Sequence, residues 1–177
     1  MKDDCLYGLV AEFESDAQLK RAAEKAYNHG YRKMDGFAPF PVEGLAERLG
    51  KKNRIPLLVL LGGILGGCSA YFMQWFANVV SYPVNIGGRP LHSWPAFIPV
   101  TFELTVLGAS LTAFLAAFAL SGLPQPYHPM FNLPEFARAS QDRFFLCIEA
   151  ADALFDAVQT RMFLEGLDPL MVAEVAK

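Results

Sequence analysis

Two long apolar runs occupy the middle of this chain and constrain its fold more than any other feature. They extend over residues 55–77 and 96–120. A helix of about 20 residues rises about 30 Å, which is the thickness of the hydrocarbon core of a bilayer. The segment that joins the runs, 78–95, is short. The two runs therefore predict a pair of transmembrane helices, a hairpin that returns the chain to the side of the membrane on which it started.

The flanking segments, 1–54 and 121–177, have the mixed composition of a folded, water-exposed domain. Neither segment is long enough to bury a large core by itself, so we expect the two to fold together. The net charge of the chain is −3. With that charge and no block of basic residues, nucleic acid is not an expected partner.

The distribution of charge predicts the orientation of the hairpin. The first 20 residues are rich in acidic side chains and lack the apolar segment of a signal peptide. Arg48, Lys51, Lys52 and Arg54 precede the first run, whereas the loop 78–95 contains only Arg89. Because basic residues concentrate on the cytoplasmic side, both termini are predicted to be cytoplasmic and the loop periplasmic.

Segment 1–41 is predicted to form the first half of a cytoplasmic α/β domain. Residues 6–13 are apolar and typical of a buried strand, and a second strand is expected over 31–37. Between them, Ser15 begins a capping-box pattern and Gly30 is placed to end the helix. Segment 42–54 follows, with an amphipathic helix over 42–49 lying on the membrane surface or, equally, a plain connector.

Segment 143–177 is predicted to form the second half of the same domain, after a Pro-rich cytoplasmic linker over 121–142 that is expected to be extended. A strand over 143–150 precedes a helix that Asp152 caps and Gly166 ends. The expected buried face of this helix consists of Leu154, Phe155, Val158 and Met162. Residues 170–175 are predicted to be a last strand, with a helix as the alternative.

The order of these elements is β-α-β, membrane hairpin, β-α-β. This order predicts a ferredoxin-like (split β-α-β) α+β domain, whose four antiparallel strands carry two helices on one face. The transmembrane hairpin is then an insertion between the second and third strands.

Small residues follow one side of each apolar run. Gly62, Gly63, Gly66 and Gly67 form two overlapping GxxxG patterns, and the second run contains a similar strip that includes Gly108 and Thr112. Such strips let helices approach closely in lipid. Two interpretations stay open: the two helices pack on each other, or a partner subunit packs on the strips.

Glu103 is the only residue of the two runs that carries a charge at neutral pH. A carboxylate exposed to lipid is costly, so this one has to be protonated, paired, or directed toward protein or water. One hypothesis is a contribution to a proton path or a quinone pocket of a neighbouring subunit. The other is a hydrogen bond to a partner helix.

Residue types that carry catalytic or cofactor chemistry are scattered. Cys5, Cys68 and Cys147 show no metal-ligand or haem-attachment spacing and are expected to be small buried apolar residues. The three histidines lie outside both runs, so paired axial ligands for a membrane haem are not available. We expect no catalytic, cofactor-binding or metal-binding residue in this chain.

Several segments resemble one protein family. The run GGRPLHSWPAFIPVTFE (87–103) is similar to the loop and second helix of the ActD subunit of bacterial Alternative Complex III, a quinol:electron-acceptor oxidoreductase. The segments YGLVAEFES (7–15), YRKMDGFAPFPVEGL (31–45) and DRFFLCIEA (142–150) resemble the cytoplasmic portions of the same family. The resemblance therefore spans nearly the whole chain.

The resemblance implies a non-catalytic subunit of an electron transport chain in the bacterial inner membrane. The expected partners are multi-helix, quinol-handling subunits and lipids, while c-type haems and iron–sulfur clusters are expected on other subunits. Glu103 matches a position of the family motif, but this match gives it no catalytic role. Two alternatives from other classes are a free-standing regulatory or ligand-binding ferredoxin-like protein anchored in the membrane, and a small proton conductor centred on Glu103.

Overall fold

The computed structural model describes residues 6–177, which form two compact units. One unit is the continuous segment 53–125, and the other combines the described residues 6–52 with 126–177. We call them the hairpin unit and the α/β unit. The prediction for Cys5 falls outside the described residues.

The α/β unit contains a four-stranded sheet with the strand order β2-β3-β1-β4. Each neighbouring pair is antiparallel, and in the central pair Gly8 lies opposite Glu149 and Phe13 opposite Phe144. The predicted strands are thus present, with the bounds β1 Leu6–Phe13, β2 Met34–Phe37, β3 Phe144–Glu149 and β4 Met171–Ala176. The C-terminal segment is therefore a strand and not a helix.

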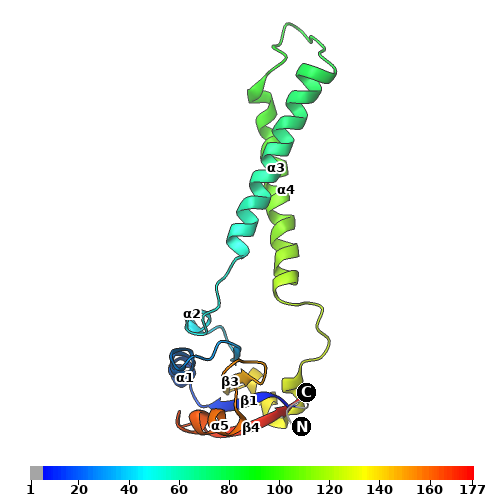
Figure 1. The fold of residues 1–177 in the computed structure, drawn as a ribbon. Coiled ribbons are helices and arrows are strands. Elements are labelled where there is room, and N and C mark those ends of the chain that lie inside the picture. Colours follow the sequence, from blue (N-terminus) through cyan, green and yellow to red (C-terminus); the bar gives the residue numbers. More distant parts are fainter. Residues whose placement is uncertain (1–5) are drawn as a thin grey trace. The chain divides into compact units, whose positions relative to one another are not determined.

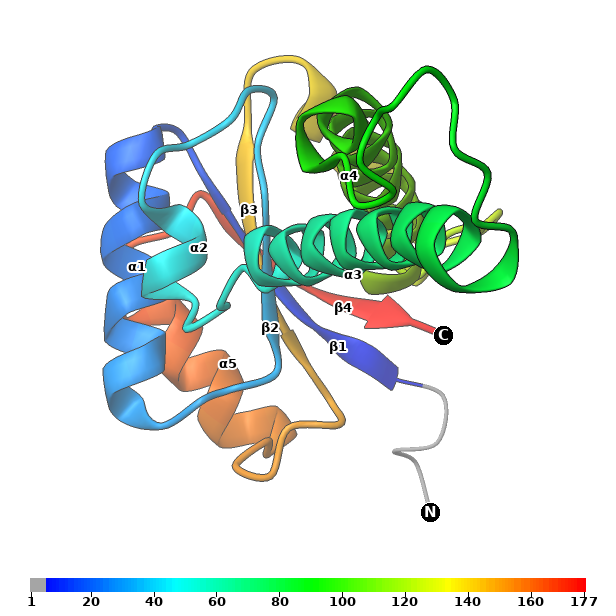
Figure 2. The same cartoon turned by 90° about the horizontal axis from the view of Figure 1, so that it is seen from above.

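Three helices cover one face of this sheet: α1 (Asp16–His29), α2 (Leu45–Arg48) and α5 (Ala157–Glu165) (Figure 2). The Ser15 side chain caps α1 by accepting a hydrogen bond from the Gln18 amide, and Gly30 ends it with φ 119°. Alternate residues of the central strands point into the core beneath the helices. The strand residues of this core are Leu9, Ala11, Phe13, Phe144, Leu146 and Ile148.

The opposite face of the sheet is covered by residues that we predicted to be an extended linker. Two 3₁₀ helices, η3 (Pro129–Asn132) and η4 (Pro134–Ser140), place Met130 and Phe136 over Phe145 and Cys147. The prediction for 121–142 is wrong in this part. Prolines exclude a regular α-helix, but each 3₁₀ turn here begins at a proline, whose missing N–H costs nothing at that position.

The predicted surface helix over 42–49 is also different in the structure. Helix α2 has only four residues, Leu45–Arg48. Leu45 and Leu49 are buried in the core of the α/β unit, where Leu45 packs on Gly36. The apolar side of this segment is therefore occupied by the protein itself and is not available to a membrane surface.

Asp152 does not cap the last helix, because Asp156 does. The Asp156 carboxylate accepts hydrogen bonds from the amides of Val158 and Gln159. This later start rotates the helix, so that Thr160 and Leu164 are buried. Of the four residues expected on the buried face, only Phe155 packs on the core, and Leu154, Val158 and Met162 are exposed.

Asp152 instead fixes the chain before β2. Its Oδ2 accepts hydrogen bonds from the amides of Arg32, at 2.7 Å, and Lys33, at 2.6 Å. These amides are consequently unavailable to a sheet partner. β2 therefore begins at Met34 and not at Tyr31, whose hydroxyl meets Thr160 Oγ1 at 3.1 Å.

The hairpin unit consists of two long helices that run side by side in opposite directions (Figure 1). α3 (Ile55–Trp75) continues into a π-helical segment, Phe76–Ser81, and α4 covers Trp94–Leu120. The two stretches, Ile55–Ser81 and Trp94–Leu120, are 27 residues each and are long and apolar enough to cross a membrane. Both are longer than predicted, because the π-helical segment extends the first through Ser81 and the second already begins at Trp94.

Candidate functional site

The first part of the candidate site is a seam of backbone contacts between α3 and α4. A Cβ added to Gly108 would lie 2.6 Å from the Gly62 carbonyl oxygen and 3.3 Å from the Gly66 Cα. One added to Gly62 would overlap the Thr112 hydroxyl, and one added to Gly66 would overlap the Leu104 carbonyl oxygen. At these positions only glycine allows the two backbones to come so close.

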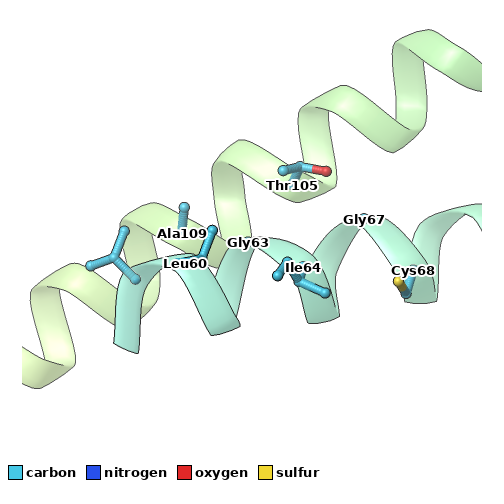
Figure 3. Close-up of a pocket in the computed structure, with 8 residues that line it drawn as sticks. Leu60, Gly63, Ile64, Gly67, Cys68, Thr105 and Ala109 are labelled. Carbon is cyan, nitrogen blue, oxygen red and sulfur yellow. The ribbon is translucent and has the colours of Figure 1, made fainter. Parts of the chain in front are cut away.

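The other two glycines of the GGILGG run lie beside the seam, in a groove of about 480 Å³ (Figure 3). A Cβ on Gly63 would meet Ala109 at 3.5 Å, and one on Gly67 would meet Thr105 Oγ1 at 2.5 Å. The groove is almost entirely apolar and is lined by Val59, Leu60, Gly63, Ile64, Gly67, Cys68, Thr105 and Ala109. The four glycines are thus divided between the seam and this groove. Cys68 is exposed, so the expectation that it is buried is wrong.

Gln74 makes a polar link between the helices that our reading of the sequence missed. Its Nε2 lies 3.1 Å from the Phe97 carbonyl oxygen and 3.2 Å from Thr101 Oγ1, both on α4. It also lies 3.2 Å from the Ala70 carbonyl oxygen on its own helix. A signal was available, since Gln74 is the one amide side chain between residues 55 and 77. A polar side chain in such a run is expected to find a partner on a neighbouring helix.

A second polar link ties the loop to the hairpin. The Tyr71 hydroxyl lies 2.7 Å from His92 Nε2, and both rings pack near Phe97. His92 lies in the loop outside both apolar runs, as the sequence places it, and its ring contacts Tyr71. Gln74 joins α3 to the first turns of α4, and Tyr71 joins α3 to the loop that precedes α4, both on the loop side of the glycine seam.

Glu103 is placed by α4 on the outside of the hairpin. Its side chain is exposed, and none of the hydrogen bonds between the described residues of the hairpin reaches it. The structure therefore brings Gly62, Gly66, Gly108 and Thr112 together and leaves Glu103 apart from them.

The α/β unit has a groove of comparable size, about 470 Å³, at the β2 edge. Its lining is largely aromatic and includes Phe37, His128, Phe131 and Phe136. His128 Nε2 lies 3.3 Å from the Tyr7 hydroxyl. Burial, together with the charge of Glu149, raises the pKa of Tyr7 to about 12, so this phenol stays neutral in the cell. The groove offers apolar contacts but little directed charge for recognising a polar ligand.

Two buried groups of the α/β unit have pKa values that follow from their surroundings. Burial raises the pKa of the Cys147 thiol to about 12, which keeps it protonated and unreactive. Burial alone would raise the pKa of Asp152, but hydrogen bonds from the amides of Lys33, Leu154 and Arg32 outweigh it and lower that pKa. Cys147 is therefore a neutral thiol in the core, and Asp152 is a carboxylate that its backbone hydrogen bonds hold in the charged form.

A comparison with known protein families shows to which family this chain belongs. The family model described as Alternative complex III, ActD subunit, matches residues 7–174, from β1 through both long helices to β4. The chain belongs to the ActD family. Membership confirms the resemblance predicted from the sequence, and it makes the chain a subunit of Alternative complex III, which associates it with electron transport and quinol oxidoreduction. A search among curated proteins finds no match.

Proposed function

We propose that this ActD chain is a non-catalytic, integral membrane subunit of a bacterial quinol:electron-acceptor oxidoreductase. In this proposal α3 and α4 cross the cytoplasmic membrane and pack against the quinol-handling subunits, while the α/β unit caps the cytoplasmic side. The observation that carries the proposal is the family match over residues 7–174, which includes both 27-residue apolar helices.

The outer surface of the hairpin supports membrane insertion. Only Gly63 and Ala70 of α3 and Phe97 and Ala116 of α4 are buried, so most of the large apolar side chains face outward. Exposure of such an apolar surface to water is unfavourable, whereas contact with lipid or with the helices of a partner is favourable. Basic residues before α3, and a single arginine in the loop, support cytoplasmic termini and a periplasmic loop.

The connectivity of the α/β unit supports a ferredoxin-like domain with the hairpin inserted into it. Its strand order is β2-β3-β1-β4, with α1 after β1 and α5 after β3. The long helices α3 and α4 lie in the connection from β2 to β3. Two segments that are each too short for a core thereby share one sheet.

The proposal also assigns the redox cofactors of the complex. Between residues 6 and 177, no three His, Cys, Asp or Glu side chains come together as metal ligands could. In this proposal the c-type haems and iron–sulfur clusters belong to partner subunits, and this chain contributes packing surface and lipid contacts.

Purification in mild detergent tests the proposal. An affinity tag on this chain is expected to retain other membrane subunits, and the eluate is expected to have the optical spectrum of c-type haem. A colourless eluate that contains this chain alone would overturn the proposal. That result would favour the alternative of a free-standing, membrane-anchored regulatory protein.

A further inference from the structure

Glu103 places a carboxyl group on one face of α4, and the hairpin unit provides no hydrogen-bond partner for it. It is the only Asp, Glu, Lys or Arg residue of α3 and α4. It follows Trp94, the first residue of α4, by nine positions, which corresponds to about 14 Å along the helix axis. If α4 spans the membrane, the carboxylate lies within the hydrocarbon core, where it needs a partner that lipid does not provide.

The position of Glu103 around α4 excludes the seam as the source of that partner. Leu104, Gly108 and Thr112 face α3. With about 100° of rotation per residue, Glu103 lies on nearly the opposite side of the helix from their centre. Residues that recur every three or four positions share this side, and we call them together the Glu103 face: Pro99, Glu103, Val106, Ser110, Ala113 and Ala117.

The Glu103 face is shaped for a neighbouring helix. Ser110 is exposed, and it stands with Ala113 and Ala117 in a row of small side chains at helical spacing. Small side chains allow a second backbone to come close, as Gly62 and Gly108 do at the seam. α3 already occupies the other side of α4, so this second row is free for another helix.

Pro99 adds a second hydrogen-bond acceptor to the same face. It lies inside α4 and has no N–H, so the Pro95 carbonyl, four residues earlier, receives no helical hydrogen bond. Helical side chains lean toward the N-terminus, which carries the Glu103 carboxylate over the turn that contains Pro99. A carboxylate and a carbonyl that lacks its usual helical donor thus share one face, and neither can donate a hydrogen bond.

We propose that the Glu103 face binds a transmembrane helix of another subunit of the complex, and that this helix brings a basic side chain to Glu103. An arginine fits best, because its five donors can serve the carboxylate and the Pro95 carbonyl together. A second copy of this chain is a poorer match, since its own Glu103 face would contribute acceptors and a like charge. The inference rests on the proposed function and names the face and the chemistry of that contact.

The test begins with retention of the complex on the tagged chain. Glu103→Leu is expected to lower the yield of haem-containing subunits about tenfold per tagged chain, and Glu103→Gln by a smaller factor. The matched control is Leu65→Ala on α3, because Leu65 is 67% exposed and lies away from α4. Its yield is expected to equal that of the wild type.

A second measurement uses the intact Glu103 and so does not depend on a variant that assembles poorly. A photo-crosslinking amino acid replaces Val106, on the Glu103 face, or Leu65 as control. The Val106 probe is expected to crosslink to one membrane helix of another subunit that contains a basic residue. Replacing that residue with glutamate, together with Glu103→Arg, is expected to restore the yield.

The outcomes separate this inference from the proposed function. If the wild-type chain retains no other subunit, the proposed function fails. If the wild type retains the complex and Glu103→Leu retains it equally, or if the Val106 probe reaches only lipid or a second copy of this chain, the inference alone is overturned. Full assembly of Glu103→Gln with lost quinol oxidation would also overturn it, because the carboxylate would then serve proton transfer.

Discussion

The two units of this chain are held together by opposite means. In the α/β unit, large apolar side chains fill a core on each face of the sheet, and the central strands are almost completely buried. In the hairpin unit the smallest residues lie inside, at the glycine seam, and the large apolar side chains lie outside. In the proposed membrane setting, burial of apolar surface from water can stabilise the first unit but not the second. The hairpin therefore depends on backbone contacts and on a few polar links.

The largest effect is expected in the core of the α/β unit. Phe145→Ala removes a fully buried ring between Phe136 and Val10, and the cavity is expected to lower the free energy of unfolding by about 4 kcal/mol. Urea unfolding of the detergent-solubilised chain, followed by far-UV circular dichroism, measures the loss. The matched control is Phe131→Ala, whose ring is 71% exposed, and it is expected to change little. Equal losses would contradict the expectation that burial of the Phe145 ring is what stabilises this face of the sheet.

The core between the sheet and the helices η3 and η4 also shows where prediction from the sequence fails. The strands and α1 were predicted because their signals are local: apolar runs, a Ser15 cap and a Gly30 terminus. The cover formed by η3 and η4 was missed because prolines indicate an extended linker, whereas the burial of Met130 and Phe136 depends on strands far away in the chain. Local patterns could not reveal that contact.

The next effect concerns Asp152, which anchors the chain before β2. Asp152→Asn removes a charge that accepts hydrogen bonds from three backbone amides, and a loss of about 3 kcal/mol at pH 7 is expected. Because the folded state lowers the pKa of Asp152, its stabilisation is present above the ordinary carboxyl pKa and is lost as the pH falls through the lowered value. Wild type and variant should therefore converge in acid. A difference that stays constant to low pH would contradict this assignment.

Asp152 shows why the start of α5 was also predicted wrongly. Asp152 and Asp156 are chemically equal candidates for the cap, and both precede an apolar stretch. The choice between them is made by the amides of Arg32 and Lys33, which lie about 120 residues earlier and bind Asp152. In the hairpin, by contrast, the long apolar runs and small-residue strips predict both helices directly. The division of the glycines between seam and groove needs the register of α3 against α4.

A change at the glycine seam is expected to have a smaller effect. Gly108→Val forces a side chain against the Gly62 carbonyl and is expected to cost about 2 kcal/mol of hairpin packing. A cysteine pair, Gly63→Cys with Ala109→Cys in a chain without other cysteines, measures the packing, because the Cβ positions are 3.5 Å apart and suit a disulfide. The seam variant is expected to slow disulfide formation in membranes. Ser69→Val, on the exposed side of α3, is the control and should leave the rate unchanged.

The smallest effect concerns the polar link at Gln74. Gln74→Leu removes the contacts to the Phe97 carbonyl and Thr101 Oγ1, and a loss of about 1 kcal/mol is expected, since hydrogen bonds between membrane helices contribute little more. Titration of the detergent micelles with SDS, monitored by the same cysteine pair, measures it. The result sharpens the comparison of the two units. In the α/β unit, which folds in water, replacing a buried amide is expected to lower the stability by more. If Gln74→Leu cost more than Gly108→Val, polar links and not backbone contact would hold the hairpin together.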